Sequence, residues 1–143
     1  MNEYLEMKKR NQYEVNKFPK FFAFTKKRFE EQIIKRGLDP KNDLDKVLYI
    51  GGGGYMLRSD KEKFDNMLER HNKELSDAIA ANKNNFIVDM FTYELANHEY
   101  SVTKDVFDTL SAVGLTREDV NNNKALRKGL AEAIKQYMAT CEY

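Results

Sequence analysis

Three polar side chains in the second half of the chain fall on a helical face that is otherwise apolar. The spacing of apolar residues over 85–100 predicts a helix, and on a helical wheel Glu94, Asn97 and His98 lie among its apolar side chains. Glu94 and His98 are one helical turn apart, so their side chains can pair. Because buried polar groups need hydrogen-bond partners, we expect this pair to bond to itself, to a tyrosine, or to His71 on another predicted helix.

The chemistry of these four residues is open to three interpretations. The first is a structural polar network. The second is a general acid/base pair in a pocket, because a buried carboxylate and imidazole have shifted pKa values. The third is a metal site, but His71, Glu94 and His98 supply only three ligands at a spacing that is not diagnostic. We expect no metal and no other cofactor, and without an activated serine or cysteine the interpretation leans away from an enzyme.

Four consecutive glycines, Gly51 to Gly54, form the second candidate site. A phosphate-binding P-loop would continue with Lys and Ser or Thr, whereas Tyr55 follows here. The apolar residues on both sides instead predict a β-hairpin over residues 47–58, with the central glycines in a tight turn. Since a two-residue turn needs only two glycines, the bare glycine backbone suits close approach of a ligand, and the candidate binding tip consists of Gly52, Gly53 and Tyr55.

The charges are unevenly distributed along the chain. Residues 1–36 hold ten Lys or Arg against five Glu, a balance of +5, and the remaining residues balance to −4. Lys and Arg alternate with Phe and Tyr in the basic part, which suits phosphate contact and base stacking, although an ordinary solvated face has the same composition. The acidic stretch 89–119 is a second candidate surface. The candidate basic binding residues are Lys8, Lys9, Arg10, Lys26, Lys27 and Arg28.

The elements that must position these side chains indicate an α+β fold dominated by about five helices. A small antiparallel sheet is predicted to contain the 47–58 hairpin and to include Phe21–Phe24. Further helices are predicted over 26–36 with Thr25 as N-cap, over 59–81 with a capping box from Ser59 to Glu62, over 103–113, and over 124–140, with a short turn or helix after Thr116.

Length and composition limit the class of protein. The 143 residues fit a single domain over 1–143, with residues 1–17 as a candidate mobile basic N-terminal arm. The lone cysteine, Cys141, excludes an internal disulfide and fits a reducing compartment. No apolar run approaches the roughly 20 residues of a membrane span, and residues 1–5 have no signal-peptide core. We therefore expect a cytoplasmic protein that does not enter a membrane.

Four motifs follow one another in a recognisable order. They are Asn16-Lys17-Phe18-Pro19, Phe21-Phe22-Ala23-Phe24, Ile50-Gly51-Gly52-Gly53-Gly54-Tyr55 and Tyr93-Glu94-Leu95-Ala96-Asn97-His98-Glu99-Tyr100. This order resembles a group of small uncharacterised proteins of phages and other mobile elements of gut Firmicutes. The resemblance implies a context and no catalytic residue: small orphan proteins of such elements often bind and inhibit a host protein, including nucleases of bacterial defence systems.

The leading functional hypothesis is a non-enzymatic protein-interaction module of a phage or mobile element. Its expected partner is a host protein, and its expected effect is to inhibit a host defence or nucleic-acid-handling enzyme, as anti-CRISPR proteins do. The first alternative is a nucleic-acid-binding accessory protein that uses Lys8 to Arg28. The second alternative is a small enzyme or ligand-binding domain centred on Glu94 and His98.

Overall fold

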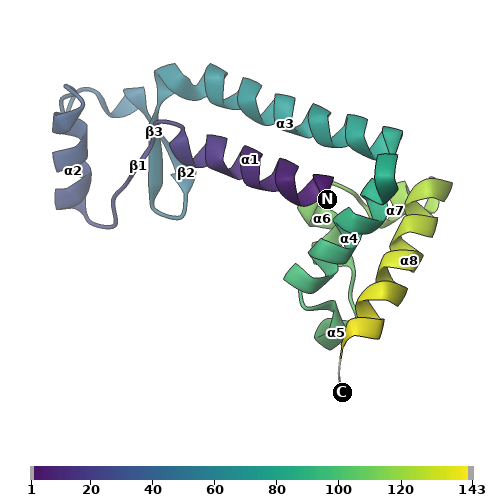
Figure 1. Cartoon of the computed structure of the whole chain (residues 1–143). Helices are drawn as coiled ribbons and strands as arrows, with labels where there is room; N and C mark the ends of the chain where they lie inside the picture. The colour runs from purple at the N-terminus through teal and green to yellow at the C-terminus, as the bar shows by residue number, and fades with distance from the viewer. Residues whose placement is uncertain (1, 142–143) are drawn as a thin grey trace. The chain divides into compact units, whose positions relative to one another are not determined.

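The computed structural model describes residues 2–141 and confirms the predicted class, an α+β fold in which helices dominate (Figure 1). This part of the chain contains eight α-helices, against about five predicted. The N-terminal segment is helical, a four-residue helix lies between the helices predicted over 85–100 and 103–113, and the short turn or helix predicted after Thr116 is a five-residue helix. The elements are α1 (Glu3–Lys17), β1 (Phe21–Phe22), α2 (Lys26–Lys35), β2 (Val47–Gly51), β3 (Gly54–Leu57), α3 (Lys61–Ala81), α4 (Phe86–Asn97), α5 (Tyr100–Thr103), α6 (Phe107–Ala112), α7 (Arg117–Asn121) and α8 (Lys124–Thr140).

The contacts of the chain gather into two compact units. The hairpin unit comprises residues 13–71, and the helical unit comprises the residues up to 12 together with those from 72 onward. Helices α1 and α3 each contribute residues to both units. None of the helices in residues 2–141 combines the length and the apolar character that crossing a membrane requires.

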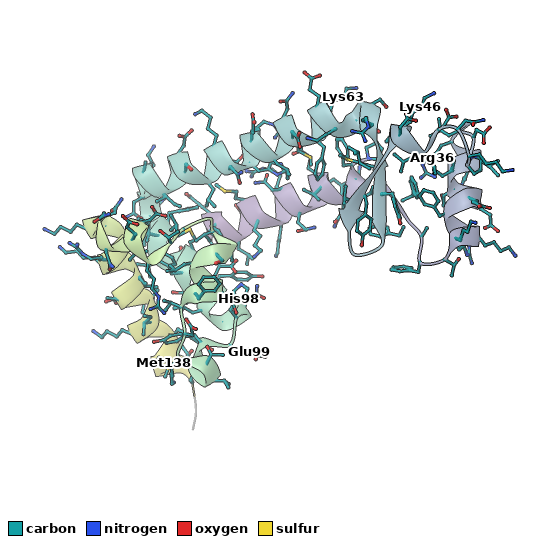
Figure 2. All side chains as sticks on the ribbon, turned by 180° about the vertical axis from the view of Figure 1, so that it is seen from behind. Arg36, Lys46, Lys63, His98, Glu99 and Met138 are labelled. Atoms are coloured by element: carbon teal, nitrogen blue, oxygen red, sulfur yellow. The ribbon has the colours of Figure 1, made fainter. Side chains whose placement is uncertain are left out.

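The hairpin unit is built on a three-stranded antiparallel sheet in the order β1-β3-β2. Phe21, Tyr55 and Tyr49 lie opposite one another in register, so their side chains share one face of the sheet. Helix α2 packs on this face through Phe29, whose ring centroid is 4.8 Å from that of Tyr55. Just after α2 the Arg36 guanidinium lies 4.2 Å from the centroid of the Phe21 ring. Figure 2 labels Arg36 in this part of the hairpin unit. The predicted inclusion of Phe21–Phe24 in the sheet is confirmed for Phe21 and Phe22, whereas Ala23 and Phe24 lie beyond the end of the strand.

The predicted hairpin turn is confirmed at Gly52 and Gly53. Gly51 pairs with Gly54, and the two residues between them have φ values of +58° and +78°. Positive φ at both central residues is what a type I′ turn requires, and glycine adopts it without steric cost. The carbonyl of Gly53 also accepts a hydrogen bond from the backbone N–H of Ala23 at 2.9 Å. The chain that leaves β1 is therefore held against the turn.

The helical unit has its core around α4 and α8, which lie side by side (Figure 1). Phe86, Met90 and Phe91 of α4 are buried in it together with apolar residues of α6, α7 and α8. Tyr4 of α1 belongs to the same core and meets Phe86 edge to face, with 5.8 Å between the ring centroids. The segment considered above as a basic arm is thus helical from residue 3 and anchored by a buried ring, while residue 1 lies outside the described part.

Two predicted helix boundaries on either side of α5 are wrong. The helix predicted over 85–100 ends at Asn97, because Glu99 adopts a left-handed conformation with φ of +53°. The helix predicted over 103–113 begins only at Phe107, because Lys104 is also left-handed, with φ of +56°. The Asp105 carboxylate accepts from the backbone N–H of Phe107 at 2.9 Å and opens α6.

The predicted N-caps have mixed outcomes. Thr25 caps α2 by accepting from the backbone N–H of Arg28 at 3.2 Å, and Thr116 forms a capping box with Asp119 at the start of α7. The capping box predicted at Ser59 is wrong, because Arg58–Asp60 form a turn of 3-10 helix that leads directly into α3. Ser59 therefore lies inside a helical turn rather than at its cap position.

Candidate functional site

The carboxylate of Glu94 is the most strongly constrained polar group in the helical unit. Its side chain is fully buried. Oε1 accepts from the Tyr4 hydroxyl at 2.7 Å and from the Lys8 ammonium at 2.5 Å, both of which project from α1. The ammonium of Lys8 also lies 4.9 Å from the centroid of the Tyr93 ring. The expectation that the carboxylate reaches a tyrosine is therefore confirmed, with Tyr4 and Lys8 as partners that the wheel of a single helix could not reveal.

Electrostatics keep Glu94 ionised. Burial by itself would raise the pKa of the Glu94 carboxyl, but hydrogen bonds from Lys8 and Tyr4 and the positive charge of Lys8 outweigh it, so this pKa lies below its usual range. Burial, followed by the hydrogen bond to Glu94, raises the pKa of the Tyr4 hydroxyl far above its ordinary value. Glu94 is thus a buried anion with a local cation, which is the arrangement of a structural ion pair and is unsuited to a general acid at neutral pH.

Asn97 and His98 complete the surroundings of Glu94 in a way that differs from the prediction. Asn97 is exposed rather than buried, although its Nδ2 lies 3.5 Å from Oε2 of Glu94. His98 Nε2 is 3.2 Å from the same oxygen, so the predicted Glu94–His98 proximity is confirmed. The two atoms form no hydrogen bond, and His98 Nε2 is one of two buried side-chain atoms in the described residues that lack a hydrogen-bond partner. Figure 2 labels His98 beside Glu99, at the break that follows α4.

His71 does not join this cluster. It belongs to the hairpin unit, where its Nε2 lies 3.1 Å from Oε2 of Glu14, and Arg70 bonds to the other oxygen of the same carboxylate. The hydrogen bond from Arg70, and to a lesser extent the one from His71, holds the pKa of Glu14 below its usual range. Within residues 2–141, no three or more potential metal-ligating His, Cys, Asp or Glu side chains come together. The three-ligand arrangement considered above is therefore not assembled.

A shallow pocket of about 600 Å³ lies beside Glu14 in the hairpin unit. Phe18, Pro19 and Met67 supply apolar lining, and the cations around it are Lys17, Lys63 and Arg70. Because Arg70 is bonded to Glu14 and the pocket is wide open to solvent, it lacks the enclosure of a typical small-molecule site.

The six basic residues predicted to bind nucleic acid are divided between the two units. In the helical unit, Lys8 is bonded to Glu94 and Arg10 to Glu74, while Lys9 is exposed. In the hairpin unit all three cations of the group are exposed, on the first turn of α2: Lys26, Lys27 and Arg28. The predicted basic surface therefore separates into a set committed to internal ion pairs and a set that faces solvent.

The predicted binding tip is lined by aromatic side chains that the sequence interpretation did not single out. Gly52 is exposed, whereas Gly53 and Tyr55 are half-buried. The ring of Phe24 lies directly over Gly53, and Phe24 is 80% exposed. The signal for this surface in the sequence is the Phe-rich run Phe21-Phe22-Ala23-Phe24, which also favours a strand.

Comparison with known proteins assigns the chain to a family. The profile of a family of unknown function, DUF7659, matches residues 3–136, which is almost the whole chain. The chain belongs to the DUF7659 family. No curated protein and no solved structure matches it.

In this DUF7659 chain the acidic stretch 89–119 contains α5 and the two left-handed residues on either side of it, Glu99 and Lys104. Five of its seven acids are exposed, and two large apolar side chains are exposed among them, Val102 at 77% and Phe107 at 63%. Arg117 pairs with Asp105 at 3.3 Å, and the other exposed acids leave this stretch with an excess of negative charge. The exposed acids are Glu99, Asp105, Asp108, Glu118 and Asp119.

Proposed function

We propose that this chain is a non-enzymatic protein-interaction module of a phage or mobile element that binds and inhibits a host defence or nucleic-acid-handling enzyme. The observation that carries the proposal is the exposure of Val102 and Phe107 among acidic side chains of the helical unit. Large apolar side chains rimmed by charges are typical of protein-binding surfaces. The order of motifs that resembles proteins of mobile elements supports the biological context.

The chemistry of the surface selects the kind of partner. Enzymes that handle nucleic acid present basic grooves to the phosphate backbone. The five exposed acids of the stretch 89–119 are complementary to such a groove, and the exposed side chains of Val102 and Phe107 supply the apolar contacts that fix the complex once the charges have met. Complementary charge accelerates association, so the proposal requires that binding weaken as salt is raised.

The backbone around this surface supports binding rather than stability alone. Glu99 and Lys104 both hold positive φ values, which cost non-glycine residues of order 1 kcal/mol each. The break they create separates α5 from α4 and α6, and it places Val102 and Phe107 outside the regular helix packing of the unit. Strained backbone conformations of this kind cluster at functional sites, which supports a binding role for this segment.

The alternative centred on Glu94 and His98 has weaker support. A site for general acid/base chemistry needs a carboxyl that substrate can reach and whose pKa is close to the working pH. Glu94 is fully buried, and its pKa lies below the usual range. These two properties favour the structural interpretation of the cluster.

The test compares proteins captured from the lysate of the host by the immobilised wild-type chain and by the double variant Val102→Ser/Phe107→Ser. We expect one host protein to bind the wild type, to be lost with the double variant, and to elute as salt is raised. Leu44→Ser, which removes an apolar side chain that is 51% exposed in the hairpin unit, is the matched control. The purified partner is then assayed for inhibition.

The proposal is contradicted if the wild type and the double variant retain the same proteins. It is also contradicted if the captured partner is acidic, or if its activity is unchanged by a stoichiometric amount of the chain.

A further inference from the structure

The hairpin unit displays three apolar side chains around its glycine turn. Phe24 is 80% exposed, Phe22 is 52% exposed and Ile50 is 38% exposed. A Cβ atom built on Gly53 would lie 2.3 Å from the Phe24 ring, and one on Gly54 would lie 3.0 Å from the Phe22 ring and 3.1 Å from Ile50. The two rings therefore lie against bare backbone, and most of their surface remains open to solvent.

The backbone holds these rings in place. Phe22 pairs with Gly54 in the sheet, and the Ala23 N–H donates to the carbonyl of Gly53 at 2.9 Å. Thr25 then caps α2, so the chain is fixed on both sides of Phe24. An aromatic side chain on a fixed backbone loses little conformational entropy when another ring stacks on it.

Positive charge lies next to the rings in the chain. Three exposed cations follow Phe24 within four residues: Lys26, Lys27 and Arg28. Within residues 2–141, none of these three side chains forms an ion pair. Glu30 and Glu31 lie on the following turn of α2, yet the hairpin unit as a whole has thirteen Lys or Arg against ten Asp or Glu, a balance of +3.

We propose that single-stranded nucleic acid binds here, with bases stacked on Phe22 and Phe24 at the glycine turn and phosphates held by Lys26, Lys27 and Arg28. Phe22 and Ile50 lie on the sheet face opposite to the one that α2 covers, so the cations adjoin the rings through Phe24, which they follow in the chain. Proteins bind single strands by stacking exposed bases on aromatic rings while cations contact the phosphates. The bases of a duplex are stacked on each other and cannot meet the rings, so a duplex would use the cations alone. This inference does not depend on the proposed function, because it concerns other residues in the other unit.

The experiment measures the fluorescence anisotropy of a labelled oligothymidylate and of its duplex with oligoadenylate as the full chain is added, at about 50 mM and about 200 mM salt. We expect the single strand to bind more tightly than the duplex. Phe24→Ala should weaken single-strand binding about tenfold or more, the effect of losing one stacked base. Phe24→Trp should retain binding, and its indole fluorescence should be quenched by the strand because the chain has no other tryptophan.

The cations are tested through the salt dependence. Lys27→Ala should weaken binding and reduce the slope of log affinity against log salt by about one. The matched controls are Ile34→Ala and Lys35→Ala, which remove exposed side chains from the same helix and should leave both quantities unchanged. Because Phe24 is largely exposed, its alanine variant should keep the wild-type melting temperature, and Phe22→Ala provides a second test of stacking.

Three outcomes would overturn the inference. The first is an absence of binding to the single strand at low salt. The second is binding that neither Phe24→Ala nor Phe22→Ala weakens, which would mean simple charge attraction. The third is equal affinity for the duplex and the single strand. Capture of an acidic protein that depends on Phe24, without binding of the oligonucleotide, would assign the surface to a protein partner instead.

Discussion

The ion pair between Lys8 and Glu94 allows a prediction about which partner matters more for stability. The two members are unequally buried: the side chain of Glu94 has no exposed area, whereas that of Lys8 is 36% exposed. Removal of the lysine leaves a fully buried carboxylate without its cation, and removal of the charge on Glu94 leaves an ammonium that can turn toward water. We therefore expect Lys8→Met to be more damaging than Glu94→Gln.

The magnitudes follow from this geometry. Breaking a buried ion pair on one side costs about 3–5 kcal/mol. Since Tyr4 still donates to Glu94 at 2.7 Å, Lys8→Met should lie near the lower end, at about 3 kcal/mol. A glutamine at 94 can keep accepting from the tyrosine, so Glu94→Gln should cost about 1–2 kcal/mol. The double variant should cost less than the sum of the two, with a coupling energy of about 1–3 kcal/mol.

The assay is urea denaturation followed by far-ultraviolet circular dichroism and tyrosine fluorescence at neutral pH. Lys9→Met is the matched control, because Lys9 is the exposed neighbour of Lys8 on the same helix and should change the free energy of unfolding by less than about 0.5 kcal/mol. If Lys8→Met and Lys9→Met destabilise the chain equally, the carboxylate does not depend on its cation and the reasoning is refuted.

The same pair predicts a pH dependence. Because the pKa of Glu94 is lower in the folded chain than in the unfolded chain, the ionised carboxylate contributes stability above its unfolded pKa. That contribution is lost as the pH falls through the folded pKa. In Lys8→Met the cation that lowers the pKa is absent, so the free energy of unfolding should fall less steeply with acid than in the wild type.

Three further predictions concern other parts of the chain. Gly129→Ala should lower the free energy of unfolding by about 1 kcal/mol although alanine favours helix, because a Cβ there would lie 2.3 Å from Ile87 Cγ2; a gain in stability in urea denaturation would show that the contact is absent. Lys27→Glu should raise the free energy of unfolding by about 0.3–1 kcal/mol, since the first turn of α2 contains no acid, and should also weaken oligonucleotide binding; a loss of stability would contradict the first part. Because the pKa of Glu14 is lowered in the folded chain, its stabilising contribution should disappear as the pH falls through that folded pKa. The free energies of unfolding of Glu14→Gln and the wild type, measured as a function of pH, should therefore converge in acid. A difference between them that stays constant with pH would contradict this.

Local sequence signals predicted most of the secondary structure. The glycine turn, the Thr25 cap and the helices predicted over 59–81 and 124–140 follow from propensity and periodicity within one element, and the structure confirms them, with the first of these helices starting at Lys61. Two helix boundaries were predicted wrongly because Glu99 and Lys104 adopt left-handed conformations, which their residue types disfavour. The spacing of apolar residues indicates helix at both positions, so the sequence of the segment gives no signal for the two breaks.

The candidate site was only half predictable for a similar reason. The wheel correctly placed Glu94 on a buried face beside His98, because periodicity identifies the face of one helix. It could not identify Tyr4 and Lys8, which are about 90 residues away in sequence and approach Glu94 only when α1 packs on α4. The spacing of Tyr4 and Lys8 by one helical turn was the sole indication in the sequence that they share a face.

Each of the four glycines in the hairpin has a physical requirement, although a tight turn explains only two of them. Gly51, Gly52 and Gly53 have positive φ values, so a side chain at any of these positions would strain the backbone. Gly54 has no such constraint, but a Cβ there would crowd Phe22, Ile50 and the carbonyl oxygen of Gly51 at 3.0–3.1 Å. Gly53 meets both requirements, because the ring of Phe24 occupies the space of its missing side chain.

These requirements explain why the hairpin tolerates the loss of stability that glycine brings to strands. If only the turn mattered, residues with side chains at position 54 would strengthen β3. Glycine at that position instead allows Phe22 to lie against the strand while about half of its surface faces solvent. A hairpin that gives up strand packing to hold two phenyl rings at its surface is better explained by the binding of a planar ligand than by folding alone, and this links the glycine motif to the proposed stacking surface.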